Sequence, residues 1–250
     1  MAKEAGHAFL KRLGKNKLRP GGVTGTQFLM DHIDWQNATC VLEVACNRGL
    51  NLLKLASEHP TVQFYGVDMD QEAIDQANQV KAELGLTNVC FAQGNALHLD
   101  FPDEQFDYLI NEAMLTMLPV PSKERILTEY YRVLKTGGVL LTHDIVLLSD
   151  YEATRQALSR AININVWPLP KLEWETLFAT AGFATEQHLS ARFTLLTLSG
   201  LIKDEGWRNS LRIIKNGFKR ENRQQFWTMY SVMNRLKDQM HFICYVNRKV

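Results

Sequence analysis

The sequence predicts an α/β protein with a doubly wound, mostly parallel sheet of seven strands and appended carboxyl-terminal helices. Between residues 39 and 145, short runs of apolar and β-branched residues alternate with longer stretches in which apolar residues recur at helical spacing. This alternation is typical of βαβ units. The chain has 250 residues, of which 46% are hydrophobic and 22% charged, a composition that can bury a substantial core. The longest apolar run, residues 193–202, is far shorter than the ~20 residues that a transmembrane helix needs.

Seven strands are expected, and each is a short apolar run between polar or turn-forming residues. Five lie in the alternating region, at residues 40–45, 62–68, 88–92, 106–111 and 139–144. Residues 183–196 could supply one or two more, and residues 241–247 are the last, with a largely helical insertion between them. Because crossover helices cover both faces of such a sheet, the ligand crevice is expected at the carboxyl ends of the parallel strands.

The predicted helices have recognisable ends. Residues 50–58 follow the first strand, Asp70 caps a helix that Gly85 ends, and Ser122 opens a helix that two glycines at 137 and 138 close. Further helices are expected at about residues 150–164 and before Gly182, separated by a loop at residues 167–170. No flexible linker or internal repeat divides the chain, so one domain is expected.

The net charge of +1 hides an uneven distribution. Residues 1–20 carry a net charge of +5, residues 201–250 carry +7, and the region between them therefore carries −11. The basic ends could face a polyanion or simply the acidic middle of the molecule. The four cysteines form no C-x-x-C pair, which argues against a zinc site or a disulfide framework, and the six histidines other than His143 lack the spacing of metal ligands. Without the apolar segment of a signal peptide, a cytoplasmic location is expected.

The segment 41–49, with the sequence VLEVACNRG, carries the strongest chemical signal. It is a buried strand that breaks into a tight loop and opens a helix, an arrangement that offers free backbone N–H groups to a ligand. About twenty residues later, Asp68 ends the second strand, where a carboxylate can accept hydrogen bonds from both hydroxyls of a ribose. The pair of features indicates a cofactor that contains adenosine.

Four motifs in order make residues 39–144 resemble the class I S-adenosylmethionine-dependent methyltransferases, in particular the small-molecule branch related to quinone-biosynthesis enzymes. The motifs are VLEVACNRG, YGVDMD, QGNALHLDFPDEQFDYLINEAMLTML and YYRVLKTGGVLLTHD. A nicotinamide-dependent dehydrogenase is disfavoured, because the loop lacks G-x-G-x-x-G and keeps only Gly49. Where the family pattern has two further glycines, this chain has Ala45 and Asn47. The resemblance implies a Rossmann-like fold with one antiparallel strand and S-adenosyl-L-methionine as cofactor.

The resemblance also assigns roles to single residues. The methionine moiety of the cofactor would be surrounded by the residues Glu43, Ala45, Cys46, Asn47 and Gly49. Asp68 would hold the ribose and Met69 would pack on the adenine, which Asn95, Ala96 and Leu97 would border. Asn111 and Glu112 would lie where the methyl group meets its acceptor. The cofactor supplies the reactive group, so the protein chiefly aligns the two reactants and no fixed catalytic triad is required.

Acid–base assistance is predicted from Glu112, His143 and Asp144, which end the fourth and fifth strands at the edge where the methyl group must emerge. His143 is the best candidate base, because an imidazole can take a proton near neutral pH. The alternation along residues 139–144 equally allows His143 to face the helix-covered flank of the sheet, which would leave Asp144 at the rim.

The acceptor itself is expected to be a small organic molecule. Candidate pocket segments are residues 19–22, 114–118 and 162–167 and the helices after Leu196, which are apolar enough to enclose an aromatic or lipophilic acceptor. On this reading, residues 1–38 form a helical arm, residues 39–150 the cofactor-binding core, and residues 151–250 complete the same domain with a helical cover at about 197–240. Two alternatives remain open, namely an RNA methyltransferase and a cofactor-binding protein without turnover.

One helix near the carboxyl end is amphipathic and basic. Arg208, Arg212, Lys215 and Lys219 share one stripe, and Trp207, Leu211, Ile214 and Phe218 share the adjoining stripe. The apolar stripe is predicted to pack on the domain, as part of the acceptor cover, while the basic stripe faces water. Near-neutral overall charge and the lack of a recognisable RNA module make nucleic acid an unexpected partner. Binding to RNA or to an anionic membrane surface is the alternative for this helix.

Overall fold

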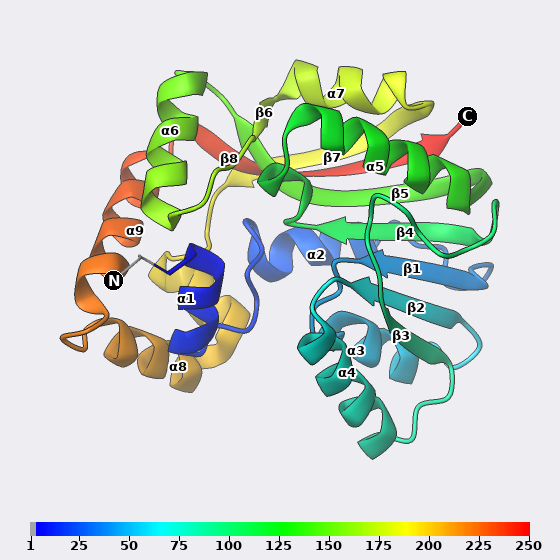
Figure 1. The fold of residues 1–250 in the computed structure, drawn as a ribbon, viewed down its shortest axis with the longest axis horizontal. Helices are drawn as coiled ribbons and strands as arrows, with labels where there is room; N and C mark the ends of the chain where they lie inside the picture. The colour runs from blue at the N-terminus through cyan, green and yellow to red at the C-terminus, as the bar shows by residue number, and fades with distance from the viewer. Residues whose placement is uncertain (1–3) are drawn as a thin grey trace.

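The computed structural model describes residues 4–250 and contains one mixed sheet (Figure 1). The strand order is β3-β2-β1-β4-β5-β8-β7, with the short β6 pairing with β5. The strands are β1 (Cys40–Val44), β2 (Gln63–Asp68), β3 (Val89–Gln93), β4 (Phe106–Glu112), β5 (Leu134–Leu147), β6 (Leu169–Pro170), β7 (Phe183–Arg192) and β8 (Met240–Lys249). Only β8 runs antiparallel to its neighbours β5 and β7, and every other pairing is parallel. The predicted fold class is therefore confirmed.

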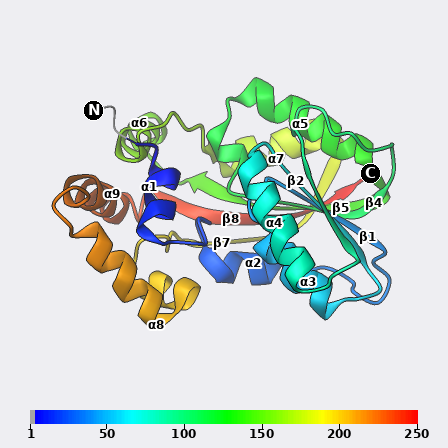
Figure 2. The same ribbon diagram turned by 60° about the horizontal axis from the view of Figure 1, so that its bottom comes forward.

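Helices cover both faces of this sheet, as expected. The helices α2 (Gly22–Met30), α3 (Leu50–Glu58) and α4 (Gln71–Glu83) pack on one face, and α5 (Val120–Val133) and α7 (Lys171–Thr180) pack on the other. Figure 2 shows α2 and α5 on opposite sides of the strands. The predicted cap of α4 is confirmed, because the Asp70 side chain accepts hydrogen bonds from the backbone N–H groups of Glu72 and Ala73.

One predicted helix has different ends. The helix α5 begins at Val120, directly after Pro119, rather than at Ser122, and it stops at Val133. The glycines at 137 and 138 do not close it. They lie within β5, where Gly137 takes a φ of 76°, so they form an irregular stretch of the strand instead.

Four helices form a layer of their own, which we call the helical cap. They are α1 (Gly6–Leu13), α6 (Tyr151–Ile162), α8 (Leu198–Gly217) and α9 (Arg223–Arg235). They share a third hydrophobic cluster with the ends of β5 and β8, and Figure 1 shows them gathered to the left of the sheet. A single-turn helix, η1 (Leu115–Met117), follows β4. Within residues 4–250, no helix is long and apolar enough to cross a membrane.

The helix α8 corrects the prediction for the amphipathic segment. It is kinked at Gly206, and its buried positions in the second half are Ser210, Ile213 and Gly217. Small side chains allow this face to approach closely, since a Cβ at Gly217 would lie 2.6 Å from the Phe226 ring. The stripe predicted to pack inward instead faces water at Trp207, Leu211 and Phe218, and only Ile214 is partly buried.

Candidate functional site

A cavity of about 710 Å³ lies between the carboxyl ends of the parallel strands and the helical cap. Its sheet side is polar and includes Glu43, Ala45, Cys46, Asn47, Asp68, Glu112 and Asp144. Its cap side is apolar and includes Leu10, Leu158, Ile162, Ile164, Val166, Phe193, Leu195, Met229 and Met233. The three segments predicted for an acceptor pocket, residues 19–22, 114–118 and 162–167, also line this cavity. They contribute Arg19, Met114, Met117, Leu118 and Ile164, among others. A polar half and an apolar half thus share one space.

The loop after β1 adopts left-handed backbone geometry at alternate residues. The φ angles are 61° at Ala45, 50° at Asn47 and 63° at Gly49. Position 49 requires glycine for two reasons. Its φ is left-handed, and a Cβ there would lie 2.3 Å from the Phe91 ring. The alanine and the asparagine therefore keep the path of a glycine-rich loop, although left-handed geometry is unfavourable for an L-alanine.

Asp68, at the end of β2, holds this loop in place. Its Oδ2 accepts a hydrogen bond of 2.7 Å from the backbone N–H of Asn47, and its Oδ1 accepts one of 2.9 Å from that of Asp70. Each carboxylate oxygen can accept more than one hydrogen bond, so both keep capacity for a ligand. Asp68 lines the cavity, as predicted from its position in the sequence.

Glu43 is a buried carboxyl group on the sheet side of the cavity. Its Oε1 accepts a hydrogen bond of 3.3 Å from Asn51 and lies 3.8 Å from Nη2 of Arg19. Its Oε2 is buried without a hydrogen-bond partner among residues 4–250. Burial raises the pKa of Glu43 to about 8, although the charge of Arg19 opposes this rise. A buried acid with a free oxygen is a suitable neighbour for a positively charged ligand.

Glu112, at the end of β4, belongs to a buried network with the segment before β1. Its Oε2 accepts hydrogen bonds from the Thr26 hydroxyl (2.7 Å) and from Nδ1 of His143 (2.8 Å). Its Oε1 lies 3.3 Å from Nη1 of Arg19, which also donates to Thr26. Burial alone would raise the pKa of Glu112, but Arg19 and His143 lower it below its ordinary value. Glu112 is thus held as an anion.

The predicted role of His143 as a base is not supported by its position. The imidazole is fully buried and is not part of the cavity wall. Its Nε2 accepts a hydrogen bond of 2.9 Å from the backbone N–H of Gly21, so the ring proton lies on Nδ1 and points to Glu112. Both ring nitrogens are therefore engaged within the protein. The strand places His143 towards α2 on the covered flank.

Asp144 faces the cavity from the next position along β5. Its Oδ1 accepts a hydrogen bond of 2.9 Å from the backbone N–H of Thr116, and its Oδ2 has no hydrogen-bond partner in the described part of the chain. Burial raises its pKa above the ordinary value. The nearby Lys123 partly offsets this rise, and its Nζ donates to the carbonyl oxygens of Leu118 (2.6 Å) and Trp167 (2.7 Å). Lys123 therefore ties together two loops of the cavity wall.

Six of the predicted cofactor residues lie outside the cavity wall. They are Gly49, Met69, Asn95, Ala96, Leu97 and Asn111. Asn111 is buried, and its amide donates a 3.0 Å hydrogen bond to the carbonyl oxygen of Val44. The Met69 side chain is 68% exposed, and its carbonyl oxygen accepts a hydrogen bond from Gln93 at the end of β3. Met69 follows β2 and residues 95–97 follow β3, whereas Gly49 lies in the loop after β1 and Asn111 lies in β4.

Sequence reasoning missed several residues of the site. Thr26, Asn51 and Lys123 each hold a group of the cavity wall in place. Asn51 lies in the first turn of α3, two residues after Gly49, and this position next to the loop is a usable signal. Lys123 gives no such signal, because a lysine next to a serine near the start of a helix is normally predicted to be exposed.

The donor set suits a cationic organic ligand better than a metal ion. Residues 4–250 contain no group of three or more His, Cys, Asp and Glu side chains that could hold a metal. The sheet side of the cavity carries four carboxyl groups, and Arg19 is the cation that approaches two of them, in Glu43 and Glu112; Arg48, Lys17 and Lys54 line the cavity elsewhere. Three of these carboxyl groups, in Glu43, Glu112 and Asp144, keep a buried oxygen without a hydrogen bond in the described chain, and that of Glu112 faces Arg19. A sulfonium compound such as S-adenosylmethionine carries the complementary charge.

Comparison with known proteins agrees with the geometry. A family model described as "Methyltransferase domain" matches residues 36–190. A protein of Haemophilus influenzae, described only as uncharacterized, is 43% identical over 252 residues and 100% of both chains. The phosphatidylethanolamine N-methyltransferase of Cereibacter sphaeroides is 36% identical over 130 residues, which are 51% of this chain and 62% of that protein. The demethylmenaquinone methyltransferase of Listeria monocytogenes serotype 4a is 34% identical over 110 residues, or 44% and 46% of the two chains.

A solved structure matches nearly the whole fold. Geranyl diphosphate C-methyltransferase from Streptomyces coelicolor A3(2), in complex with Mg²⁺, geranyl diphosphate and S-adenosyl-L-homocysteine, superposes with a TM-score of 0.68 at 15% sequence identity. The match covers 91% of this chain and 79% of that chain. Fold, site and family together define a class I S-adenosylmethionine-dependent methyltransferase. The chain belongs to the methyltransferase-domain family, as its sequence motifs predicted.

Proposed function

We propose that the protein transfers a methyl group from S-adenosylmethionine to a small, largely apolar acceptor that occupies the cap side of the cavity. The observation that carries this proposal is the division of a single cavity into a polar sheet side with four carboxyl groups and an apolar cap side. The methyl group of the cofactor is bound to a positively charged sulfur that is already a good leaving group. The work left to the protein is therefore to orient the two molecules and to exclude water.

On the sheet side, we assign the cofactor to the loop after β1 and the end of β2. Glu43 would face the positive charge of the cofactor with its free Oε2, and Asp68 would accept hydrogen bonds from the ribose. The adenine would lie towards Met69 and residues 95–97, which supply an exposed side chain and a loop at the end of β3.

On the acceptor side, Asp144 is the polar group best placed to orient the acceptor. Its free Oδ2 can accept a hydrogen bond from a hydroxyl or an amine, and its raised pKa favours taking up a proton from such a group. Glu112 would act through its charge, because its Oε2 is already shared by Thr26 and His143 and its Oε1 faces Arg19. His143 would serve as a positioning residue for Glu112 and Gly21.

The apolar cap side indicates the class of acceptor. Met229 and Met233 of α9 line this side together with Leu158, Ile162, Ile164 and Val166, and none of these side chains offers a strong hydrogen-bonding group to a ligand. Two relatives are named for phosphatidylethanolamine and demethylmenaquinone, which both carry long hydrocarbon chains. Residues 197–240, which include α9, would then be the cover of the acceptor site. An aromatic or lipophilic acceptor fits this wall, whereas a polyanion such as RNA does not.

The test combines cofactor binding with a search for the methylated product. Titration calorimetry should show binding of S-adenosylhomocysteine, and Asp68→Asn should weaken that binding at least about tenfold, because hydrogen bonds to a charged acceptor are lost. Asp75→Asn, an exposed carboxylate on α4, is the matched control and should bind as the parent does. With methyl-labelled S-adenosylmethionine and a fractionated cell extract, label should appear in the small-molecule or lipid fraction. Label in RNA, or none in any fraction, would contradict the proposal.

A further inference from the structure

The outer surface of α8 and α9 exposes five large apolar side chains, which we call the aromatic face. The exposed fractions are 61% for Trp207, 58% for Leu211, 57% for Phe218, 56% for Trp227 and 37% for Tyr230. Three of the rings form a connected group, since Phe218 and Trp227 have ring centroids 6.5 Å apart and Trp227 stacks on Tyr230 at 5.6 Å, while Trp207 and Leu211 continue the stripe of Phe218 along α8. A connected apolar surface of this kind commonly marks an interaction site.

Unpaired cations border the aromatic face. Arg208, Arg212, Lys215 and Lys219 lie on the adjoining stripe of α8, and among residues 4–250 none of them forms an ion pair with a carboxylate. Residues 206–237 contain eight Lys and Arg against one Glu. This charge cannot be balanced within the two helices, so it is available to an anionic partner.

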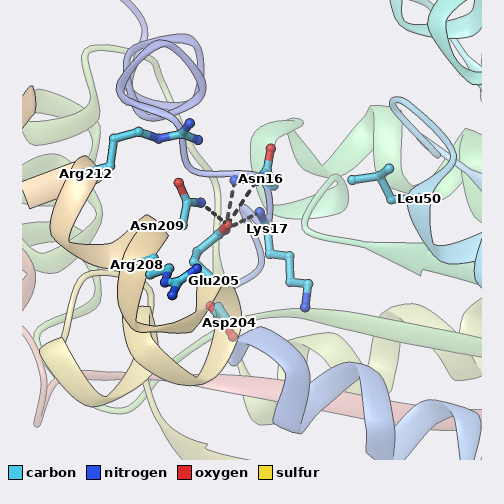
Figure 3. Close-up of a pocket in the computed structure, with 8 residues that line it drawn as sticks. All are labelled: Asn16, Lys17, Leu50, Asp204, Glu205, Arg208, Asn209 and Arg212. Carbon is cyan, nitrogen blue, oxygen red and sulfur yellow. Dashed lines mark hydrogen bonds between the residues drawn. The ribbon is translucent and has the colours of Figure 1, made fainter.

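Two of these cations, Arg208 and Arg212, reach a hollow of about 620 Å³ beside α8 (Figure 3). Arg208, Arg212 and Lys17 line it, together with two acidic residues. Those acids are already engaged: Asp204 pairs with the buried Lys15, and Glu205 accepts hydrogen bonds from the backbone N–H groups of residues 16 and 17. With Asp204 balanced by Lys15, three cations remain in the hollow against the single carboxylate of Glu205, and this excess of positive charge suits a phosphate group.

The helix α9 connects this surface to the cavity. Its inner residues Met229 and Met233 line the cavity, while Trp227 and Tyr230 belong to the aromatic face on its outer side. Aromatic and aliphatic side chains next to Lys and Arg are the composition of helices that lie in a membrane interface. Leucine and phenylalanine in the middle of the stripe gain from burial in lipid, and leucine offers no stacking surface to a base.

We propose that the aromatic face and its bordering cations dock the protein on the surface of an anionic phospholipid bilayer, with lipid phosphates taken up by Arg208 and Arg212. Docking would hold the outer side of α9 against lipid, one helix away from the apolar side of the cavity. The docking is independent of turnover, and the methyltransferase chemistry could stand without it.

The first test is sedimentation of the full chain with vesicles. The protein should bind vesicles of mixed phosphatidylcholine and phosphatidylglycerol at low ionic strength, should bind pure phosphatidylcholine weakly, and should be released by concentrated salt. Arg208→Gln/Arg212→Gln should reduce binding at least about tenfold. Arg125→Gln/Arg160→Gln is the matched control, because it removes two exposed arginines from α5 and α6. Equal binding by both double variants would overturn the proposal.

The second test locates the contact. Brominated phosphatidylglycerol vesicles should quench tryptophan emission of the parent protein, and Trp207→Phe/Trp227→Phe should abolish the quenching while preserving vesicle binding. Trp207→Ser/Leu211→Ser should weaken vesicle binding, whereas Leu172→Ser, at another exposed apolar residue, should not. Binding of S-adenosylhomocysteine and the thermal midpoint should stay unchanged in all of them. No binding to anionic vesicles, or salt-sensitive binding to RNA in its place, would overturn the proposal.

Discussion

A single methyl group distinguishes the loop after β1 from a loop with glycine at its first left-handed position. Ala45 takes a φ of 61°, which an L-residue adopts only at a cost. Ala45→Gly should therefore raise the free energy of unfolding by about 0.5–1 kcal/mol, even though glycine has the more flexible unfolded chain. Chemical denaturation would measure this. Ala92→Gly, at an exposed position of β3, should be destabilising instead, and a loss of stability in both variants would contradict the strain at Ala45.

The raised pKa of Glu43 predicts a pH dependence of cofactor binding. Without ligand, Glu43 keeps its proton until the pH approaches its pKa of about 8. A positive charge next to it favours the ionised form, so binding of S-adenosylmethionine should release this proton, and affinity should rise with pH and level off near pH 8. Calorimetry in buffers of different ionisation enthalpy would count the proton. In Glu43→Gln the affinity should be weaker and should lose this pH dependence. If the affinity of Glu43→Gln rose with pH as that of the parent protein does, Glu43 would not be the group that faces the cofactor charge.

The raised pKa of Glu43 also affects the stability of the ligand-free protein, and in the opposite direction. Because the pKa in the folded state lies above the ordinary value of 4.5, the contribution of Glu43 to stability is present below about pH 4.5 and is lost as the pH rises to about 8. Cofactor binding and stability should therefore change in opposite directions over this range.

At the scale of single residues, the sequence predicts which residues belong to the site better than it predicts which way their side chains point. The strand-loop-helix pattern after residue 40 and the carboxylate at the end of the second strand were enough to predict Glu43 and Asp68, and both line the cavity. The alternation of β5 has period two, so it separates His143 from Asp144 without saying which of them faces the cavity. That choice depends on α2, a segment more than a hundred residues earlier in the chain, whose Gly21 binds the imidazole.

The contact between α2 and β5 depends on a missing side chain. A Cβ at Gly25 would lie 2.4 Å from Cε1 of His143, and the ring cannot turn away without losing Gly21 and Glu112. Gly25→Ala should therefore destabilise the protein by about 1–3 kcal/mol, as overpacking of a core does, and should weaken cofactor binding by displacing Arg19. Denaturation and calorimetry would measure both effects. Thr24→Ala, an exposed neighbour, is the control, and equal stability of the two variants would show that α2 can shift freely.

Elements were predicted more reliably than their orientation. The strands and helices of the cofactor half appear within a few residues of their expected ends, because caps and apolar periodicity are local signals. The helix α8 shows the limit: two stripes at helical spacing were visible, but the face that packs is made by Ser210, Ile213 and Gly217. Small residues at a close contact leave little trace in a pattern of hydrophobicity.

At the scale of the molecule, the segment between α1 and α2 is joined to α8 by a buried ion pair. Nζ of Lys15 lies 3.2 Å from Oδ2 of Asp204, and neither side chain is accessible. Lys15→Met would leave Asp204 buried without its cation, which should reduce the free energy of unfolding by about 3–5 kcal/mol. Lys11→Met, an exposed lysine on α1, should have little effect on stability.

A double variant separates the two contributions. Lys15→Met/Asp204→Leu removes both charges and should recover part of the lost stability, although the backbone N–H of Val23 loses its acceptor. Urea denaturation of the four proteins would complete the cycle. A single Lys15→Met variant as stable as the parent would show that the pair does not hold this segment.

The place of β8 in the sheet also sets an order of events during synthesis. This strand follows all the others in the chain, yet it lies between β5 and β7, and its side chains enter the core on both faces of the sheet. Until the ribosome has released residues 240–249, β5 and β7 have no common neighbour and both present open edges. Before that point the strands of the cofactor-binding half can already pair, but the sheet is still incomplete. The nascent chain therefore exposes strand edges that chaperones can bind.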